Sequence, residues 1–336
     1  MSHISQILLE RERSMLSEFA FPTSSSRGRA VDIPPCQNRT EFQRDRDRII
    51  HSKSFRRLMH KTQVFLSPME EHYRTRLTHT LEVTQIARIM ARALRLNEDL
   101  TEAIAMGHDL GHTPFGHAGE DALRRCFDPH FAHNEQSLRV VDVLERDGRG
   151  LNLTWEVRDG ILNHTGERLA STLEGVLVKY ADRIAYINHD IDDACRAGVL
   201  CLEDIPKDIL NVLGTRHSSR INTMVAAIIE ASAESPRIMM VKEVEEAMLA
   251  LRQFLFSSVY RNPIVKSEDE KAKQLLIQLF EYYKKNPEEM PISYKQNIER
   301  DGIERCVCDY IAGMTDRYAI RTYKSIFLPE VWRGNN

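Results

Sequence analysis

Residues 105–120 read AMGHDLGHTPFGHAGE. This stretch places three histidines, an aspartate and a glutamate around one helix end and one turn. Adjacent His108 and Asp109 offer a nitrogen and an oxygen from consecutive positions, a pair that suits a borderline or hard divalent cation. The pair gains weight from His79 upstream and Asp182 downstream, which both lie in segments with helical periodicity. These four residues predict a catalytic metal site, because three helices could bring them to one ion and leave positions open for water and substrate.

The helix expected over residues 72–96 carries His79 on its apolar face. That face consists of apolar residues at helical spacing, namely Leu77, Val83, Ile86, Ala87, Met90 and Leu94. A lone histidine there is more often a satisfied core residue than a ligand, and the His108-Asp109 pair reverses these odds. Arg76 projects from the same face one turn earlier, where it is well placed to clamp an anionic group that the metal also holds.

Two expected helices meet in the central stretch, one over residues 98–112 that ends on the His-Asp pair and one over residues 116–127. His117 and Glu120 fall at i and i+3 in the first turn of the second helix. The carboxylate can orient the imidazole and keep it protonated, which predicts an acid poised near neutral pH. A structural capping role for Glu120 is the alternative.

The helix expected over residues 171–197 carries a polar stripe, because Asp182, Tyr186 and Asp190 follow one another at i, i+4 and i+8. Residues on both sides of Asp182 look buried, so its carboxylate needs a partner, and a metal is a suitable one. His133, which opens another helix, and His164 are each ambiguous on sequence alone.

Periodicity predicts an all-α chain, since almost no window alternates apolar and polar residues over the length of a strand. Further helices are expected near residues 4–20, 133–145, 154–163, 204–213, 219–233, 241–260, 268–285 and 301–326. A breaker-rich loop, either mobile or laid over a site, is expected over residues 22–38. A small hairpin within residues 211–225 is the open alternative to helix.

Composition describes an ordinary globular protein, with 42% hydrophobic and 28% charged residues and a net charge of -3. Nucleic acid or a membrane surface would therefore need a local basic patch. Residues 39–61 are the candidate, and they fit either a solvated helix face laced with ion pairs or an anion-binding wall for a triphosphate or a nucleic-acid strand. No bilayer span or signal peptide is apparent, and the six scattered cysteines predict free thiols in a reducing cytoplasm.

The ordered ligand pattern resembles the HD superfamily of metal-dependent phosphohydrolases, and more closely its bacterial dGTPase-like deoxynucleotide triphosphohydrolases. Four stretches carry the likeness: residues 55–65 (FRRLMHKTQVF), 76–83 (RLTHTLEV), 108–120 and 309–319 (DYIAGMTDRYA). The likeness covers residues 39–326. It implies an all-α HD-domain helical fold with the metal site between core helices and with extra C-terminal helices. The chain would then divide into an N-terminal helix and loop (1–38), a phosphohydrolase core (39–200) and a C-terminal helical region packed on it (201–336).

The resemblance implies hydrolysis of a dNTP, either dGTP or several dNTPs, to a deoxynucleoside and tripolyphosphate, with water attacking the α-phosphorus. One divalent ion per site is implied: Mn²⁺, Mg²⁺, or another transition metal such as Ni²⁺, Co²⁺, Fe²⁺ or Zn²⁺. Relatives also suggest a homo-oligomer (hexamer or tetramer), a second dNTP as an allosteric ligand, and single-stranded nucleic acid at a basic surface. No membrane partner is implied.

The likeness also assigns roles to individual side chains. His117 would be the proton donor to the departing 5′ oxygen, with Glu120 as its relay and His112 beside it. The remaining residues would contact the substrate: Arg76 the α-phosphate, Arg183 a phosphate, Gln63 the region of the 3′ hydroxyl, Tyr186 and Asp190 the sugar, and His133 the active site more generally. The role of residues 309–319 stays open between packing, a subunit contact and a part of the triphosphate site.

Two other classes of protein share part of this pattern. A nucleotidase or phosphodiesterase of the HD superfamily would keep the metal ligands, but it does not predict His117 and Glu120 at their spacing. A non-catalytic protein that binds nucleotides or nucleic acid would be expected to have lost part of the ligand set, and here all four ligands are present.

Overall fold

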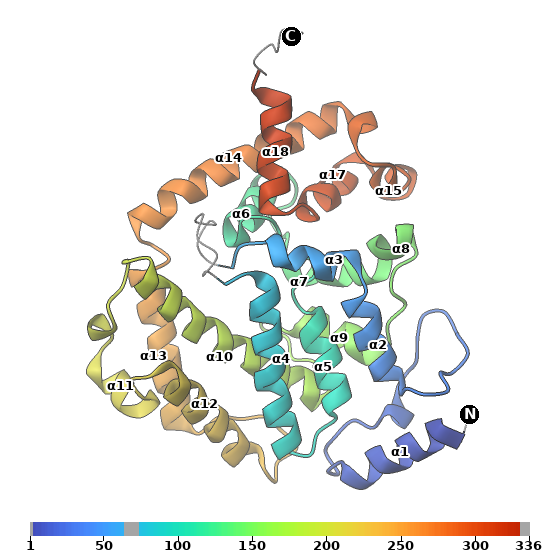
Figure 1. Cartoon of the computed structure of the whole chain (residues 1–336), viewed down its shortest axis with the longest axis vertical. Coiled ribbons are helices and arrows are strands. Elements are labelled where there is room, and N and C mark those ends of the chain that lie inside the picture. The colour runs from blue at the N-terminus through green and yellow to red at the C-terminus, as the bar shows by residue number, and fades with distance from the viewer. Residues whose placement is uncertain (1–2, 64–73, 330–336) are drawn as a thin grey trace, which may run out of the picture.

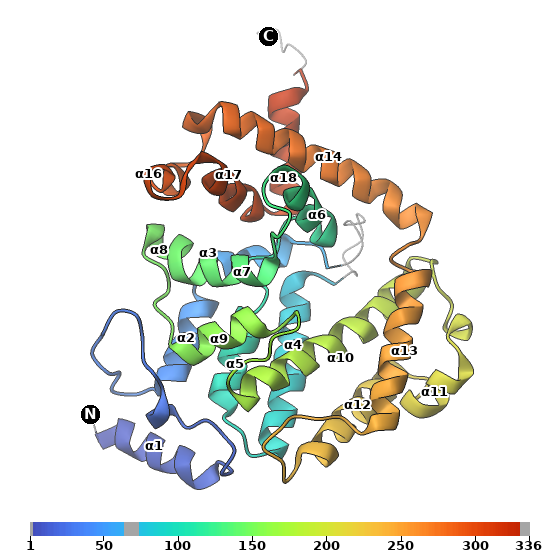
Figure 2. The same cartoon turned by 180° about the vertical axis from the view of Figure 1, so that it is seen from behind.

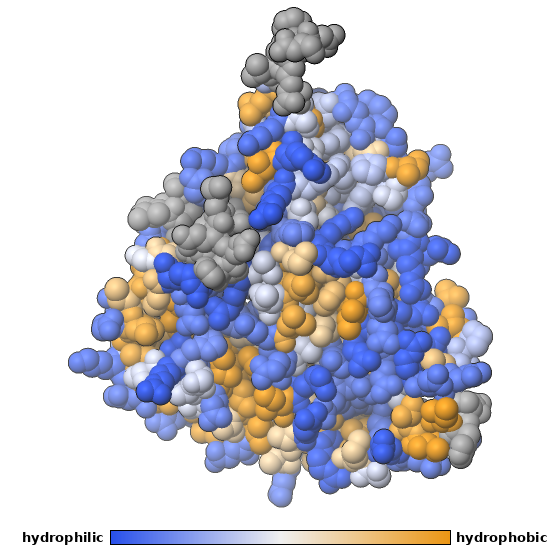
Figure 3. Space-filling view, viewed as in Figure 1, coloured by the Kyte–Doolittle hydropathy of each residue, from blue (hydrophilic) through white to orange (hydrophobic). Residues whose placement is uncertain are grey.

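The computed structural model describes residues 3–63 and 74–329, and within them the chain folds almost entirely into helices (Figure 1). In these residues the β contacts are two isolated bridges, Arg29 with Thr154 and Thr62 with Thr75. The predicted all-α class is therefore confirmed. None of the described helices is long and apolar enough to cross a membrane, and Figure 3 shows apolar residues as separate patches on a largely hydrophilic face.

Four helices, three of which carry or directly precede the expected metal ligands, pack against one another in the middle of the molecule (Figure 1). They are α4 (Arg76–Ala93), α5 (Glu98–Gly107), α9 (Trp155–Asn163) and α10 (Leu173–Arg196). Side chains fix three of their starts, because the capping oxygens of Thr75, Asn97 and Thr172 accept the backbone N–H groups of Thr78, Leu100 and Gly175. Each such cap contributes about 1 kcal/mol, so the first turn of α4, which holds His79, has a defined position.

Two hydrophobic clusters meet at the central stretch. The larger cluster contains the four helices above together with α2 (Glu41–Ile50), α11 (Lys207–Leu213), α12 (His217–Ser232) and α13 (Lys242–Ser258). The smaller cluster is formed by α6 (Gly116–Cys126), α14 (Pro263–Lys285), α17 (Ile303–Ala312) and α18 (Asp316–Phe327), which lie together in Figure 2. Leu110 belongs to the first cluster and Phe115 to the second, so the turn between His108 and His117 crosses from one core to the other. The division of the chain at residues 38 and 200 stays a prediction.

The remaining helices are shorter or connect these elements. Their bounds are α1 His3–Met15, α2 Glu41–Ile50, α3 Lys53–Arg57, α7 His133–Arg139, α8 Glu145–Gly148, α11 Lys207–Leu213, α12 His217–Ser232, α13 Lys242–Ser258, α15 Ile292–Lys295 and α16 Ile298–Asp301. Short 3₁₀ turns lie at Thr23–Ser25, Leu58–His60, Leu202–Asp204 and Pro287–Glu289, and a π-helical turn lies at Val140–Leu144.

Three predicted elements need correction. The hairpin within residues 211–225 is wrong, because Gly214 at φ +100° ends α11 and α12 begins at His217. The single helix over residues 301–326 is two helices, since Thr315 adopts an extended backbone and its side chain accepts the N–H of Tyr318 to start α18. The N-terminal helix ends at Met15 rather than near residue 20.

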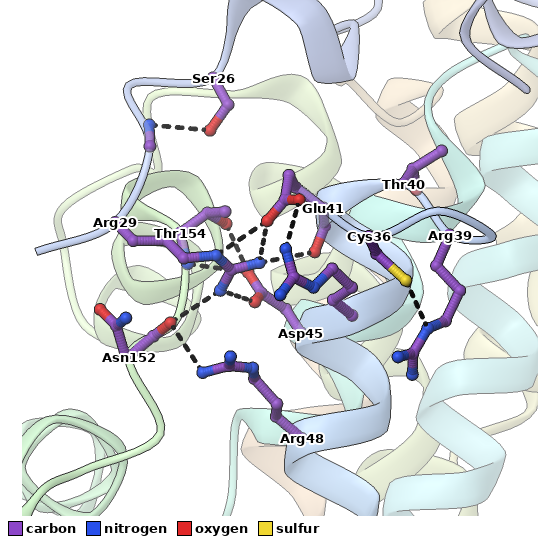
Figure 4. A network of polar contacts seen from close by, with 12 residues as sticks. Ser26, Arg29, Cys36, Arg39, Thr40, Glu41, Asp45, Arg48, Asn152 and Thr154 are labelled. Carbon is purple, nitrogen blue, oxygen red and sulfur yellow. Dashed lines mark hydrogen bonds and ion pairs between the residues drawn. The ribbon is translucent and has the colours of Figure 1, made fainter. Parts of the chain in front are cut away.

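The breaker-rich N-terminal loop is anchored by Arg29 (Figure 4). Its guanidinium contacts the carboxylates of Glu41, at 2.6 Å, and Asp45 on α2, and donates to the carbonyl of Asn152 at 2.7 Å. Asp45 also accepts the N–H and the hydroxyl of Thr154 at 2.8 and 2.6 Å. The loop is therefore bound to α2 and to the segment before α9.

In the basic stretch over residues 39–61, most basic residues on α2, and Arg39 just before it, form ion pairs with carboxylates. Arg39 lies 2.6 Å from Asp47, and Arg46 lies 3.0 Å from Asp47 and 3.1 Å from Glu102. Lys61 points inward instead, where its Nζ donates to the carbonyls of His112 and Ala312 at 2.5 and 2.8 Å. These contacts favour the ion-paired helix face over an anion-binding wall for α2.

A buried carboxyl in α10 predicts a pH-dependent stability. Glu174 accepts the N–H groups of Phe21 and Asn97, both at 2.9 Å, and burial raises its pKa from 4.5 to about 7 despite those bonds. The folded state thus keeps a proton that the unfolded chain loses between pH 4.5 and 7, so the free energy of unfolding falls as the pH rises through this window, by up to about 3 kcal/mol. We expect Glu174→Gln, whose amide oxygen still accepts both bonds, to remove this contribution when denaturant unfolding is compared at pH 5 and pH 8. An unchanged pH dependence in the variant would contradict the assignment.

Candidate metal centre and active site

The four expected metal ligands converge at the junction of α4, α5 and α10. His79 Nε2 lies 3.1 Å from the Oδ1 of Asp182 and 4.0 Å from the Oδ2 of Asp109. His108 Nε2 lies 3.6 Å from Asp109 and 3.9 Å from Asp182. One donor atom each from His79, His108 and Asp109 fall within 4.8 Å of one another, which is the spacing of ligands around a common ion. The structure therefore brings together all four residues that the sequence singled out.

Local structure explains why His108 presents a bare nitrogen to this cluster. It stands just after the last residue of α5, and its Nδ1 lies 2.7 Å from the carbonyl of Ala105. A carbonyl can only accept, so Nδ1 carries the proton and Nε2 keeps its lone pair. That Nε2 is buried and has no hydrogen-bond partner within residues 3–63 and 74–329. An orphaned acceptor facing two carboxylates fits a cation, and the cluster has the chemistry of a divalent metal site.

The two carboxylates are ionised in this setting. Burial alone would raise the pKa of Asp109, but Arg76 and the neighbouring histidines hold it well below its usual range, and Arg76 lies 2.7 Å from Asp109 Oδ2. Burial likewise opposes ionisation of Asp182, and its contacts with His79 and His108 hold its pKa well below the usual value. Both groups are therefore ready to bind a cation without first losing a proton.

A second group of residues surrounds Glu120 at the start of α6. Its carboxylate lies 3.5 Å from His117 Nδ1 and 3.2 Å from His133 Nδ1, and it accepts the backbone N–H of His133 at 3.1 Å. Burial would raise the pKa of Glu120, but the bonds from the two histidines hold it well below its usual range. Glu120 thus contacts His117 and also accepts an N–H from the first turn of α7, and its roles as relay and as cap stay predictions.

A continuous row of imidazole rings joins this group to the metal ligands. From inside to outside the ring centroids are 5.0 Å apart for His108 and His164, 5.3 Å for His164 and His133, 4.8 Å for His133 and His112, and 5.8 Å for His112 and His117. The row ends at His117, whose side chain is 80% exposed. Burial lowers the pKa of His112 well below its usual value, whereas His133 has a raised pKa because the bond and charge of Glu120 outweigh burial. The two clusters therefore form one site.

The expected substrate contacts lie around this site with different surroundings. Gln63 is buried beside Arg76, and its Oε1 has no hydrogen-bond partner among the described residues. Asp190 receives a hydrogen bond from the hydroxyl of Tyr260, and burial raises its pKa well above the usual value. Tyr186 is partly buried and is a neutral phenol, since burial raises its pKa to about 12, and Arg183 lies 6.0 Å from the ring centroid of Tyr180. Their contacts with sugar and phosphate stay predictions.

Residues that the sequence did not single out complete the site. His164 stands in the imidazole row, and His189 and Glu82 lie behind His79. The available signals were weak: Glu82 falls at i+3 from His79, and His189 falls at i+7 from Asp182. Such spacings place residues on one helix face without showing what faces them from another helix.

The stretch 309–319 holds two segments of the site in place. Asp316 accepts the backbone N–H of Thr62 at 2.9 Å, the hydroxyl of the same residue, and the N–H of Phe115 at 2.9 Å. Thr62 precedes Gln63, and Phe115, at φ +61°, is the residue before α6. Asp316 therefore clamps the Gln63 segment to the start of the helix that carries His117 and Glu120.

Replacing Asp316 with asparagine should destabilise this clamp. An amide offers one acceptor oxygen in place of two, so a buried N–H is left facing an NH₂ group, at a cost of about 1–3 kcal/mol. We expect a lower midpoint of thermal unfolding and a lower turnover number. Glu304→Gln is the matched control, because Glu304 pairs with Lys284 on the surface at 2.5 Å and its loss should leave both quantities unchanged. A wild-type midpoint in the Asp316 variant would rule out the clamp.

The family models and the relatives matched by sequence agree on one family. The HD domain family model matches residues 76–187, and the phosphohydrolase-associated domain matches residues 238–325. A deoxyguanosinetriphosphate triphosphohydrolase-like protein of Caldanaerobacter subterraneus subsp. tengcongensis is 58% identical over 99% of this chain and 98% of its own length. Proteins of the same description from Desulfatibacillum aliphaticivorans and Clostridium tetani are 51% and 48% identical, covering 95% and 92% of this chain and 97% and 92% of their own lengths. Among solved structures, a hypothetical protein from Aquifex aeolicus aligns with 84% of this chain and 71% of its own at 20% identity and a TM-score of 0.44.

Proposed function

The chain belongs to the deoxyguanosinetriphosphate triphosphohydrolase-like family of HD-domain proteins, and on that premise we propose that it hydrolyses deoxynucleoside triphosphates to a deoxynucleoside and tripolyphosphate. In this reaction water attacks the α-phosphorus and the bond to the 5′ oxygen breaks. The new P–O bond stays with tripolyphosphate, and the 5′ oxygen of the sugar takes up a proton. The substrate is dGTP or several dNTPs.

The observation that carries this proposal is the row of imidazoles between the two clusters. Phosphodiester and phosphate monoester hydrolases of the same superfamily need the metal ligands and also expel alkoxides, so the ligands alone do not select the reaction. Release of the nucleoside needs an acid that protonates the 5′ oxygen. His117 at the outer end of the row, oriented by Glu120, supplies that acid. General acid catalysis of this kind contributes about 10²–10⁴-fold to a rate.

His79, His108, Asp109 and Asp182 would hold a divalent ion, which would supply Lewis-acid polarisation of a phosphoryl oxygen and a template for the attacking water. Mn²⁺ and Mg²⁺ are the first candidates, and Ni²⁺, Co²⁺, Fe²⁺ and Zn²⁺ are compatible with the same donors.

The surrounding residues bind and orient the triphosphate and sugar in this proposal. Arg76 already neutralises Asp109 at 2.7 Å, and its guanidinium has further donors that can reach an α-phosphate oxygen. Arg183 contacts a second phosphate. The unpartnered amide oxygen of Gln63 accepts from the 3′ hydroxyl, and Tyr186 and Asp190 line the sugar. A tyrosine ring beside C2′ would disfavour the extra hydroxyl of a ribonucleotide.

Product analysis tests the proposal directly. The purified protein is incubated with an equimolar mixture of the four dNTPs and Mn²⁺ or Mg²⁺ in ¹⁸O-labelled water. The products are then separated and their masses are measured by mass spectrometry. We expect nucleoside and tripolyphosphate, with the label in tripolyphosphate. Monophosphate with pyrophosphate, or release of single phosphates, would assign the protein to another HD chemistry. Absence of turnover with every metal, with and without added dGTP as an activator, would favour a binding protein.

A further inference from the structure

A histidine and a glutamate stand in line behind the metal ligand His79. His189 lies on α10, two turns beyond Asp182, and is 1% exposed. Its Nδ1 is 3.4 Å from the Nδ1 of His79, with the two ring planes at 88°, and its Nε2 contacts the Oε2 of Glu82. Glu82 lies one turn after His79 on α4. Two helices thus contribute alternate members of one chain of contacts, from the ligand to a carboxylate.

With His189 a neutral imidazole, one distribution of protons satisfies both of its contacts. A carboxylate can only accept, so His189 carries its proton on Nε2 and presents a lone pair at Nδ1. His79 must then carry its own proton on Nδ1, since two lone pairs would otherwise face each other across 3.4 Å. With Nδ1 occupied in this way, Nε2 is the nitrogen of His79 that can bind a metal. It lies 3.1 Å from Asp182 Oδ1, and a bound cation would lie between these two atoms. Glu82 therefore determines, through His189, which nitrogen of His79 can bind a metal.

We propose that Glu82 and His189 are positioning residues that fix the tautomer and ring orientation of His79 for metal binding. The proposal rests on the metal site of the proposed function, but it does not depend on the substrate or on the reaction. Partners of this kind, which hydrogen-bond to a ligand from behind, change metal affinity by about 10–100-fold when they are removed.

The other histidine ligand has no comparable dependence on side chains. His108 is oriented by the backbone carbonyl of Ala105, which no substitution removes. His79 is thus the ligand whose donor strength can be set by other residues, and Glu82 is the residue that sets it. Arg74 lies 3.4 Å from Glu82 and keeps that carboxylate charged by proximity.

The neighbouring His217 supplies a matched control. Its ring stacks on His189 with centroids 6.2 Å apart, and its Nε2 lies 3.6 Å from Asp192. It packs against the same residue without standing between Glu82 and His79. A change at His217 therefore disturbs the local packing while the proposed chain of hydrogen bonds stays complete.

Mn²⁺ binding to the full-length protein, freed of metal with a chelator, tests the inference without any substrate. Affinity is measured by titration calorimetry and by the electron paramagnetic resonance signal of free Mn²⁺. We expect about 10–100-fold weaker binding for His189→Phe and for Glu82→Ala. His189→Asn places an acceptor oxygen where Nδ1 was, so it should recover most of the affinity, and His217→Asn should bind as the wild type does. Because both residues act through one chain, the double variant of His189→Phe and Glu82→Ala should be no weaker than the worse single variant.

The proposal would be overturned by wild-type affinity in a folded His189→Phe protein, by no recovery with asparagine, or by additive losses in the double variant. A similar loss in His217→Asn would point to general disruption of α10 and would also refute it. Failure of the wild-type protein to release tripolyphosphate leaves these measurements intact, so the inference and the proposed reaction are tested separately.

Discussion

Replacing Asp109 with asparagine is expected to abolish Mn²⁺ binding and to lower dNTP hydrolysis by at least about 10³-fold, because a metal in such a site stabilises the transition state by several kcal/mol. Asparagine has the same shape but no charge, and the carboxylate it replaces lies within 4.0 Å of both histidine ligands. Metal content after dialysis and the steady-state rate measure the two effects. Retention of a stoichiometric metal ion and of turnover would remove Asp109 from the site.

The stability of the Asp109→Asn variant separates the role of Asp109 as a metal ligand from its role as the counter-charge of Arg76. Asp109 also neutralises Arg76, which is 3% exposed and bonded to it at 2.7 Å. Asp109→Asn therefore leaves a buried guanidinium without a counter-charge, which costs on the order of 3 kcal/mol. Asp182→Asn is the matched variant, since Asp182 pairs with His79 rather than with an arginine. We expect both variants to lose the metal, and only Asp109→Asn to unfold at a clearly lower temperature in the metal-free state. Equal unfolding midpoints would show that Arg76 has another anionic partner.

The metal ligands could be predicted from the sequence because helical periodicity already determines which residues share a face. His79 falls on the apolar stripe of α4, Asp182 interrupts the buried part of α10, and His108-Asp109 directly follows α5. Once three apolar faces must pack on one another, the polar residues that lie on those faces must meet. The convergence of these residues follows from burial, and the resemblance to a family adds the reaction.

Contacts between distant segments could not be predicted in the same way. Asp316 looks like an ordinary helix-start aspartate, yet it binds Thr62 and Phe115, which lie more than 200 positions earlier. Glu82 looks like a solvated i+3 residue until α10 places His189 beside it. The hairpin alternative and the unbroken helix over residues 301–326 were wrong for a local reason. Gly214 ends α11 and Thr315 caps the start of α18, and hydrophobic periodicity does not detect either signal.

Glu120 contacts both the proposed acid His117 and the start of α7. One carboxylate orients His117, bonds the ring and the backbone of His133, and lies 2.9 Å from Arg124. Its substitution would disturb the start of α7 together with the acid, so a rate loss in Glu120 variants has two causes. His117 is the better probe, because its side chain is exposed and we expect its removal to leave the fold of α6 and α7 unchanged.

His117→Gln is expected to lower turnover of dNTPs by about 10²–10⁴-fold, the contribution of a positioned general acid, while Mn²⁺ affinity and the unfolding midpoint stay at wild-type values. The deficit arises because the 5′ oxygen leaves as a strongly basic alkoxide unless a proton reaches it. A dNTP analogue with sulfur in place of the 5′ oxygen releases a thiolate, which is far less basic and needs no proton in the transition state. The ratio of wild-type to variant rates should therefore be large for the natural substrate and close to one for the sulfur analogue. Equal ratios for the two substrates would mean that His117 binds the substrate or positions a neighbour, and that the proton comes from another member of the imidazole row.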